Sequence, residues 1–239
     1  MRVVVTRPLA KAERTIARLA GLGHEAVLLP LFKPVYHPFR AKAALSEPFS
    51  AIAITSGEAL KALEGEPAPG SDVLAMPLFA VGAATASAAR EFGFRNVAES
   101  QGDGAELARL MAARRGPEDD RPVLYLAGTP RARRFERTLE ESAVPLRIVE
   151  AYEMVADPLP LVDQQRLLVE QRVDIVLFYS RRNAEAFFSL PVFAASRAAL
   201  DKTLFLCISR NVADAVPDEF RKKAIIAMRP DEDALLDLL

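Results

Sequence analysis

Short, uninterrupted runs of apolar residues recur along the chain, and each is followed by a polar or glycine turn and then by an Ala- and Leu-rich stretch. Runs without polar alternation are typical of parallel strands buried on both faces, and the stretches between them favour helices. The pattern therefore predicts an α/β fold with parallel sheets flanked by helices. The predicted strands cover residues 2–6, 25–31, 51–54, 78–81, 97–99, 123–126, 147–155, 175–178, 203–208 and 224–228.

The stretch LFAVGAATASAAREFGF at residues 78–94 shows the repeating device most clearly. A strand runs into Gly82, a helix follows over residues 83–91, and Gly93 stands where a helix C-terminal glycine belongs. The first N–H groups of such a helix have no internal partner, so they suit an anion, and Thr85 could add a hydroxyl donor. Any α/β turn shares these features, so a purely structural turn is the alternative.

The second half of the chain repeats the first. Residues 175–178 with Tyr179 and Ser180 match residues 51–54 with Thr55 and Ser56. In the same way, the pairs of matching segments are 203–208 with 78–81, 224–228 with 97–99, and VVVTRP with VLYLAGTP. The chain is therefore an internal duplication of five strands that alternate with helices.

The order of the pieces predicts two flavodoxin-like lobes, each with a five-stranded parallel sheet. Residues 1–34 plus 157–239 form discontinuous lobe 1, and residues 39–150 form lobe 2. Residues 35–38 and 151–156 are the linkers, because the first lies in a proline-rich segment that cannot form a central strand and the second lies in another extended segment. Ligands of parallel α/β sheets bind beyond the carboxyl ends of the strands, so the strand-to-helix turns are the expected binding residues.

Charge and composition narrow the possible partners. The 239 residues are 51% hydrophobic and 26% charged, with a formal net charge of -1, which gives no support for nucleic acid as a partner. No apolar run reaches the length of a membrane span, and the chain enters a strand at once without a signal peptide. The single Cys207 lies in an apolar run and excludes an internal disulfide. These features predict a cytoplasmic protein without a membrane partner.

Five segments, spread over most of the chain, resemble the uroporphyrinogen-III synthase family. They are VTRP (5–8), ITSGEAL (54–60), FAVGAATASAAREFGF (79–94), AY (151–152) and FYSRRNAEAF (178–187). The resemblance implies the bilobed fold, and it implies cyclisation of hydroxymethylbilane to uroporphyrinogen III with inversion of the D ring and loss of water. It further implies a small-molecule substrate, a monomer, and no cofactor or metal.

Site residues follow from matching positions. Tyr152 matches the family's tyrosine and is the candidate for assisting the leaving hydroxyl; a packing role is the alternative. The substrate-binding candidates, each of which could instead only cap a helix, are Thr6, Arg7, Thr55, Ser56, Gly82, Thr85, Ser180, Ser209 and Asn211. One departure concerns residues 209–212, where SRNV replaces the family's Gly-x-x-Thr turn. Ser209 or Asn211, or backbone N–H groups alone, would have to supply the donor there.

Two other classes of protein fit parts of the pattern. A non-catalytic bilobed binding protein for an anionic small molecule would share the fold, but such proteins usually carry an export signal. A receiver-type signalling domain requires an acidic cluster and an aspartate to phosphorylate at the strand ends. Those ends here carry Thr6, Arg7, Thr55, Ser56 and Gly82, which makes the receiver class a poor fit.

Overall fold

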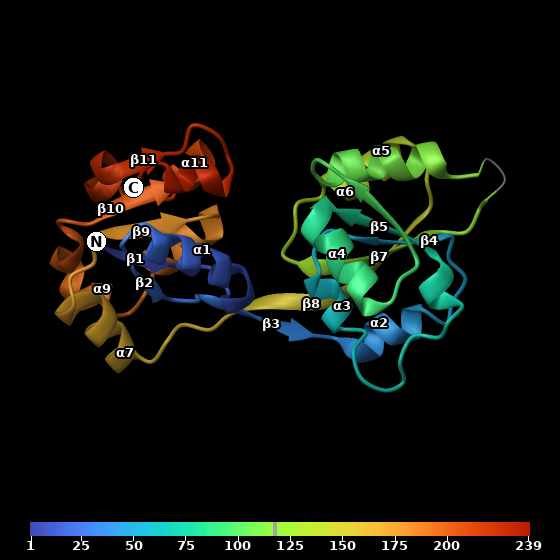
Figure 1. Cartoon of the computed structure of the whole chain (residues 1–239), viewed down its shortest axis with the longest axis horizontal. Coiled ribbons are helices and arrows are strands. Elements are labelled where there is room, and N and C mark those ends of the chain that lie inside the picture. The colour runs from blue at the N-terminus through green and yellow to red at the C-terminus, as the bar shows by residue number, and fades with distance from the viewer. Residues whose placement is uncertain (117–118) are drawn as a thin grey trace. The chain divides into compact units, whose positions relative to one another are not determined.

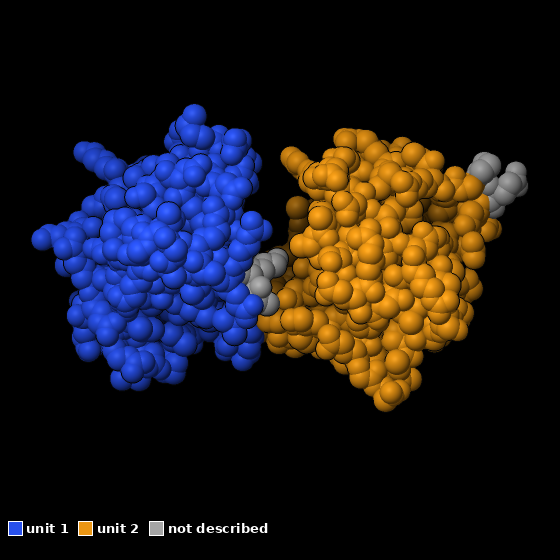
Figure 2. Space-filling view, in the orientation of Figure 1, with its two compact units in different colours: residues 1–33, 156–239 blue, residues 34–155 orange. Residues whose placement is uncertain are grey.

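A computed structural model describes residues 1–116 and 119–239 of the chain. Over these residues the chain divides into two compact units (Figure 2). Unit 1 consists of residues 1–33 and 156–239, and unit 2 consists of residues 34–155. Each unit has its own sheet and its own helices, so each is described by itself.

Unit 1 is built on a sheet with the strand order β11-β10-β9-β1-β2, in which neighbouring strands are parallel. Its strands are β1 (Arg2–Val5), β2 (Glu25–Leu28), β9 (Ile175–Phe178), β10 (Leu204–Cys207) and β11 (Ala224–Ile226). Its helices are α1 (Leu9–Gly21), α7 (Leu161–Gln165), α8 (Arg181–Phe188), α9 (Phe193–Ser196), α10 (Arg210–Ala213) and α11 (Glu232–Leu236). Shorter helical turns are η2 (Arg166–Glu170), η3 (Arg197–Leu200) and η4 (Asp218–Lys223).

Unit 2 has a sheet with the order β3-β8-β7-β4-β5-β6. Its strands are β3 (Phe32–Tyr36), β4 (Ala51–Ile54), β5 (Pro77–Val81), β6 (Asn96–Ser100), β7 (Val123–Thr129) and β8 (Leu146–Ala156). Its helices are α2 (Pro38–Ala44), α3 (Glu58–Lys61), α4 (Gly82–Phe92), α5 (Gly104–Arg114) and α6 (Arg134–Glu141), with the turn η1 (Val73–Ala75). Strands β4 to β8 pair in parallel.

The two strand orders confirm the duplication and the predicted fold class. The matching segments make β7, β8, β4, β5 and β6 equivalent to β1, β2, β9, β10 and β11. With that equivalence, the order β8-β7-β4-β5-β6 in unit 2 is the order β2-β1-β9-β10-β11 in unit 1. In unit 1 this is the 2-1-3-4-5 order of flavodoxin-like sheets. Unit 2 has the same arrangement of these five strands. The first of them along the chain, β4, is equivalent to the third strand of unit 1, β9.

The prediction of five strands in lobe 2 is wrong by one, because β3 joins that sheet as a sixth strand. Leu31 O accepts a hydrogen bond from Asp157 N, and Ala151 O accepts one from His37 N. The partner numbers rise on one strand as they fall on the other, so β3 runs antiparallel to β8. Pro34 has no N–H to donate, which is tolerated at the edge of a sheet. The proline pattern excluded a central position correctly but did not exclude this edge position.

Helices cover both faces of the unit 2 sheet (Figure 1). On one face, α2, α3 and α4 pack on residues that include Ile52, Leu78 and Leu126. On the other face, α5 and α6 pack on Ala53 and Tyr125, among others. Strand β4 is buried at every position, as expected of a parallel strand covered on both sides. Apolar side chains therefore fill both faces, and polar groups gather at the ends of the strands.

Helix signals in the sequence have mixed outcomes. Gly93 ends α4 with φ +118, a left-handed conformation that favours glycine. Asp103 caps α5 by accepting hydrogen bonds from the N–H groups of Ala105 and Glu106. Thr55 and Glu58 have the spacing of a capping box, but α3 begins after Gly57 without a side-chain cap. Both side chains bind tyrosines instead.

Candidate functional site

The carboxyl end of the unit 2 sheet brings several of the predicted residues together. Between β4 and β7 the direction of strand addition reverses, since β5 and β6 extend the sheet on one side and β8 on the other. Ligands of doubly wound sheets bind at such a switch point, beyond the carboxyl ends of the strands. Thr55 and Ser56 follow β4 there, and Gly128 and Thr129 end β7. The switch point therefore marks the candidate site in unit 2.

Three of the four tyrosines in the chain bind one turn at this point, residues 55–58. The hydroxyls of Thr55 and Tyr125 are 3.1 Å apart, and the Ser56 side chain lies close enough to the Tyr152 phenol to act on its pKa. Tyr36 donates to the Glu58 carboxylate at 2.5 Å. The tyrosines come from β7, β8 and β3, so the turn ties three strands together through phenol groups.

Tyr152 is half-buried and packs against the core face that contains α2, α3 and α4. Its ring centre lies 6.5 Å from that of Tyr36. Burial raises the pKa of the Tyr152 phenol, and the hydrogen bond with Ser56 opposes that rise. The phenol is therefore protonated at neutral pH and suited to donating a hydrogen bond.

Glu58 places a negative charge among these phenols. Its carboxylate accepts from Tyr36 and also lies 3.6 Å from the ammonium group of Lys61. Burial raises the pKa of Tyr36 well above its ordinary value, and the hydrogen bond and charge of Glu58 raise it further. The same charge adds to the rise of the Tyr152 pKa. The turn thus holds two phenols in their neutral form around the Glu58 carboxylate.

The next strand-to-helix turn joins β5 to α4. Gly82 has φ +74, which favours glycine, and a Cβ added there would meet no heavy atom within 4 Å. Among the residues that the structure describes, none provides a side-chain cap for α4, and Thr85 is half-buried in its first turn. The equivalent helix in unit 1, α10, also starts without a side-chain cap, after Ser209. Both turns leave backbone donors directed beyond the sheet.

In unit 1 the predicted residues serve the fold. Thr6 is buried, and its hydroxyl donates to Leu177 O at 2.9 Å. Ser180 caps α8 by accepting from Asn183 N at 3.1 Å. The Asn183 side chain in turn donates to Thr6 O at 3.0 Å. These bonds join the ends of β1 and β9, the equivalents of β7 and β4.

Arg7 belongs to a half-buried ionic cluster beside them. Its guanidinium lies 2.8 Å from Glu232 Oε1 and 4.1 Å from the ring centre of Tyr179. Thr15 and Tyr179 both donate hydrogen bonds to Glu232. Burial favours a higher pKa for Glu232, but these hydrogen bonds and the Arg7 charge outweigh it and lower the pKa. Arg7 therefore has an internal counterion, whereas Asn211, on α10, is exposed.

Sequence reasoning missed several residues of these clusters: Tyr36, Glu58, Tyr125, Gly128, Tyr179 and Glu232. Each lies at the end of a strand or in the first turn of a helix, which is the signal that could have found them. Tyr36 was hidden because its segment was interpreted as a linker. Gly128 lies beyond the predicted strand at residues 123–126, whereas β7 continues through it to Thr129.

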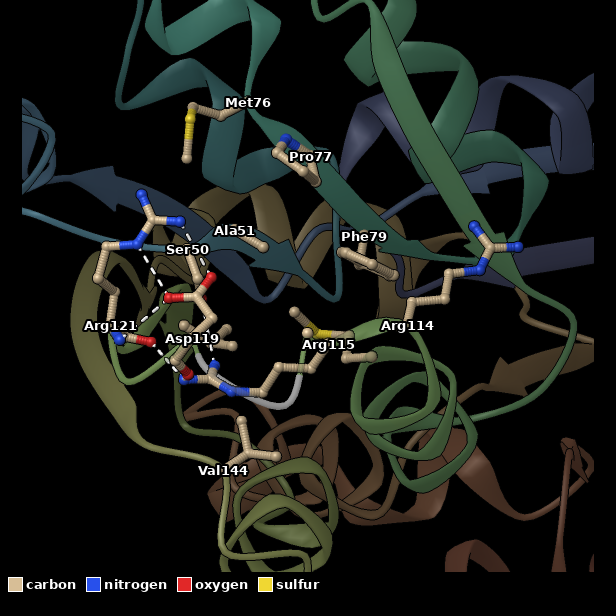
Figure 3. Close-up of a pocket in the computed structure, with 13 residues that line it drawn as sticks. Ser50, Ala51, Met76, Pro77, Phe79, Arg114, Arg115, Asp119, Arg121 and Val144 are labelled. Atoms are coloured by element: carbon tan, nitrogen blue, oxygen red, sulfur yellow. Dashed lines mark hydrogen bonds and ion pairs between the residues drawn. The ribbon is translucent and has the colours of Figure 1, made fainter.

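A cavity of about 310 Å³ lies at the opposite edge of the unit 2 sheet (Figure 3). It adjoins Ala51, Pro77 and Val123, which stand at the amino ends of β4, β5 and β7. Arg121 at its rim is paired with Asp119 at 2.9 Å, and Figure 3 shows Arg114 directed away from that pair. The cavity is thus separate from the turns that carry the predicted residues.

Residues 1–116 and 119–239 contain neither a cluster of metal ligands nor a membrane-spanning helix. No group of three or more His, Cys, Asp or Glu side chains there could hold a metal ion. Within the same residues, no helix is long and apolar enough to cross a membrane.

Two duplicated, doubly wound sheets with hydroxyl-rich turns at their carboxyl ends define a bilobed α/β protein of the ligand-binding type. The family model described as uroporphyrinogen-III synthase HemD matches residues 13–237. The chain belongs to this family, whose members are cyclising hydro-lyases.

Solved structures agree on the fold. A uroporphyrinogen-III synthetase from Helicobacter pylori is 21% identical, with a TM-score of 0.66, and the match covers 100% of this chain and 98% of that one. A mutant uroporphyrinogen III synthase from Thermus thermophilus is 22% identical, with a TM-score of 0.57 and coverage of 99% and 96%. No curated protein matches the chain. At these identities the neighbours support the fold alone.

The unit 1 cluster gives a testable pH dependence. We expect Glu232→Gln to lower the free energy of unfolding by about 1–2 kcal/mol at pH 7, because Arg7 loses a partly screened counterion. The pKa of Glu232 is lowered in the folded state, so its contribution is present above the ordinary glutamate pKa of about 4.3 and is lost as pH falls through the folded value. Urea unfolding of both proteins from pH 7 to pH 3 measures the difference.

Glu185→Gln is the control, since Glu185 forms an exposed pair with Arg181 on α8. It should change the free energy of unfolding by less than about 0.5 kcal/mol. A deficit of Glu232→Gln that stays constant down to pH 3 would show that the ion pair does not stabilise unit 1.

Proposed function

We propose that the chain is a uroporphyrinogen-III synthase that cyclises hydroxymethylbilane to uroporphyrinogen III, with inversion of the D ring and loss of water. The family match over residues 13–237 is the observation that carries the proposal. The hydroxyl groups and free helix N–H donors at the ends of the strands support it. They suit a substrate that carries acetate and propionate groups around a linear tetrapyrrole.

In this proposal the protein works mainly by positioning. The substrate reacts without an enzyme, so the site has to fold it and exclude the wrong closure. Departure of the hydroxyl gives an azafulvene cation, the D ring attacks through its substituted carbon, and the resulting spiro intermediate fragments and recloses. The candidate substrate-binding residues in unit 2 are Thr55, Ser56, Gly82 and Thr85. Those in unit 1 are Thr6, Arg7, Ser180, Ser209 and Asn211.

Within unit 1 the contacts rank these candidates. The hydroxyls of Thr6 and Ser180 already have partners in the fold, and Arg7 is paired with Glu232. We therefore propose that Thr6, Ser180 and Arg7 act through their backbone groups and by positioning their neighbours. Direct contact of their side chains with the substrate is the weaker assignment. Ser209 and Asn211 sit at the uncapped start of α10 and are the stronger candidates for direct contact.

We assign to Tyr152 the assistance of the leaving hydroxyl. A phenol with a raised pKa is a poor acid, so a hydrogen bond to the departing oxygen is a better assignment than complete proton transfer. The phenol lies near Ser56 at the switch point, which supports the assignment. Packing alone would not require a bonded hydroxyl at the end of a strand.

The proposal extends to a cytoplasmic monomer that acts on a small molecule without nucleic acid. A net charge of -1 offers no basic surface for phosphates. The single cysteine, Cys207, is buried, which suits a reducing compartment.

Incubation of the purified protein with hydroxymethylbilane tests the function directly. We expect uroporphyrinogen III as the main product, formed faster than the spontaneous reaction, with the isomers separated by chromatography. A reaction that contains only uroporphyrinogen I, formed at the spontaneous rate, would disprove the proposed activity.

Tyr152→Phe tests the assigned hydroxyl. The change keeps the ring and removes its hydrogen bonds, so we expect turnover to fall by roughly 10- to 100-fold while the fold is kept. Tyr179→Phe in unit 1 is the matched control, because it also removes the hydroxyl of a half-buried phenol and should leave turnover within about twofold. Steady-state kinetics and thermal melting measure both. Unchanged turnover in Tyr152→Phe would reduce Tyr152 to a packing residue.

Thr85→Ala tests whether the start of α4 binds a substrate carboxylate. Loss of one hydroxyl donor to a charged group costs about 1.5–3 kcal/mol of binding, which corresponds to a KM raised by roughly 10- to 150-fold. Stability should rise slightly, because alanine is the better helix former. Ser87→Ala removes a hydroxyl from the exposed side of the same helix and should leave KM unchanged. If Thr85→Ala loses activity and stability together, Thr85 is a structural residue.

A further inference from the structure

The position of Tyr152 depends on an irregularity between β7 and β8. Ala127 is paired with Glu150, but the next residue, Gly128, is paired with Tyr152, so Ala151 is an extra residue in β8. Side chains alternate between the faces of a strand. Such a β-bulge changes the direction in which the following side chain points.

The core contacts show the effect of the bulge. Val149 and Ala151 both pack on the face that contains α2, α3 and α4. Simple alternation would direct Tyr152 to the opposite face, beside α5 and α6. Tyr152 instead packs on the same face as Val149 and Ala151. The extra residue therefore moves the phenol to the face on which Tyr36 lies.

Gly128 provides the space that this phenol occupies. A Cβ at position 128 would collide with Tyr152 Cζ and would lie 2.5 Å from the hydroxyl oxygen and 2.8 Å from Cε1. The backbone of Gly128 does not have a positive φ, so other residues could adopt its conformation. The glycine is therefore required by the ring of Tyr152 and not by its own backbone.

Two contacts thus fix the phenol from different sides. Gly128 lies against the ring and the hydroxyl, and Ser56 lies near the phenol in the turn after β4. Gly128 lies near the end of β7 and Ser56 follows the end of β4, and these strands flank the switch point. A side chain at position 128 would displace the hydroxyl from Ser56 without removing it from the protein.

We propose that Gly128 is a positioning residue for the synthase reaction: the missing side chain lets the Tyr152 ring lie against the end of β7 with its hydroxyl at Ser56. This inference rests on the proposed function, because it assumes that Tyr152 contacts the substrate. Placement of a reacting group to within about 1 Å can change a rate by about 100-fold. The placement of the hydroxyl, and not only its presence, therefore sets turnover.

Gly128→Ala tests the proposal with a readout that does not depend on activity. The chain has four tyrosines, so labelled tyrosine rings give four sets of NMR signals, and Tyr152→Phe identifies the set of Tyr152. We expect Gly128→Ala to shift the Tyr152 signals and to leave those of Tyr179 in unit 1 unchanged. Unshifted Tyr152 signals would overturn the proposed contact.

Kinetics of the same variants test the consequence. We expect Gly128→Ala to lower kcat by roughly 10- to 100-fold with a smaller change in KM, and to add nothing to Tyr152→Phe in the double variant. Shifted signals with unchanged kcat, in a protein whose Tyr152→Phe variant loses turnover, would overturn the positioning role and leave the proposed function intact. Unchanged turnover in Tyr152→Phe itself would instead contradict the role assigned to Tyr152.

Two further variants control for folding. Gly21→Ala places a Cβ where no heavy atom lies within 4 Å, at a glycine without a positive φ, and should change neither the spectrum of Tyr152 nor kcat. If Gly128→Ala does not fold, Tyr152→Leu in the same chain removes the colliding ring and should restore folding. A double variant that also fails to fold would overturn the proposal, because the ring would not be the cause.

Discussion

Burial of the parallel strands on both faces is the constraint on which the rest of the structure depends. Strands such as β4 and β9 have no exposed side. Polar side chains can therefore reach water or a ligand only where a strand ends and a turn begins. The hydroxyl clusters of both units lie at these ends, and the position of each cluster follows from the strand order. Function in this fold is thus confined to a few turns, whose geometry the packed sheet holds in place.

The turn at residues 55–58 shows how such a place is used. A local capping box would satisfy the start of α3 with the side chains of Thr55 and Glu58. Those side chains bind Tyr125 and Tyr36 instead, and α3 is short and has no side-chain cap. The turn therefore lacks the stabilisation of a local helix cap, but its side chains contact three strands. The result is a set of phenols with fixed hydroxyls, which is what a positioning site requires.

The sequence predicted what local rules determine. Apolar runs located the central strands, Gly93 marked the end of α4, and the internal repeat predicted two flavodoxin-like sheets. It did not predict β3, because pairing with β8 depends on residues more than a hundred positions away. It also did not predict that β7 extends through Gly128, since glycine before Thr-Pro is typical of a turn. Tyr152 was found by family resemblance, but its partners required the bulge and the register.

The two copies of the frame have diverged in what they place at the switch point. In unit 1, Thr6 and Asn183 join the ends of β1 and β9, and Arg7 is neutralised by Glu232. In unit 2, Arg131 after β7 is paired with Glu136 and Glu150, and the glycine at position 128 leaves space for the phenol of Tyr152. An ionic cluster with internal partners stabilises a sheet end but has little capacity left for a ligand. A hydroxyl held by one serine keeps further hydrogen-bonding capacity. In the proposed reaction the reacting hydroxyl therefore belongs to unit 2, whereas the side chains of Thr6 and Arg7 at the switch point of unit 1 are bound within the fold.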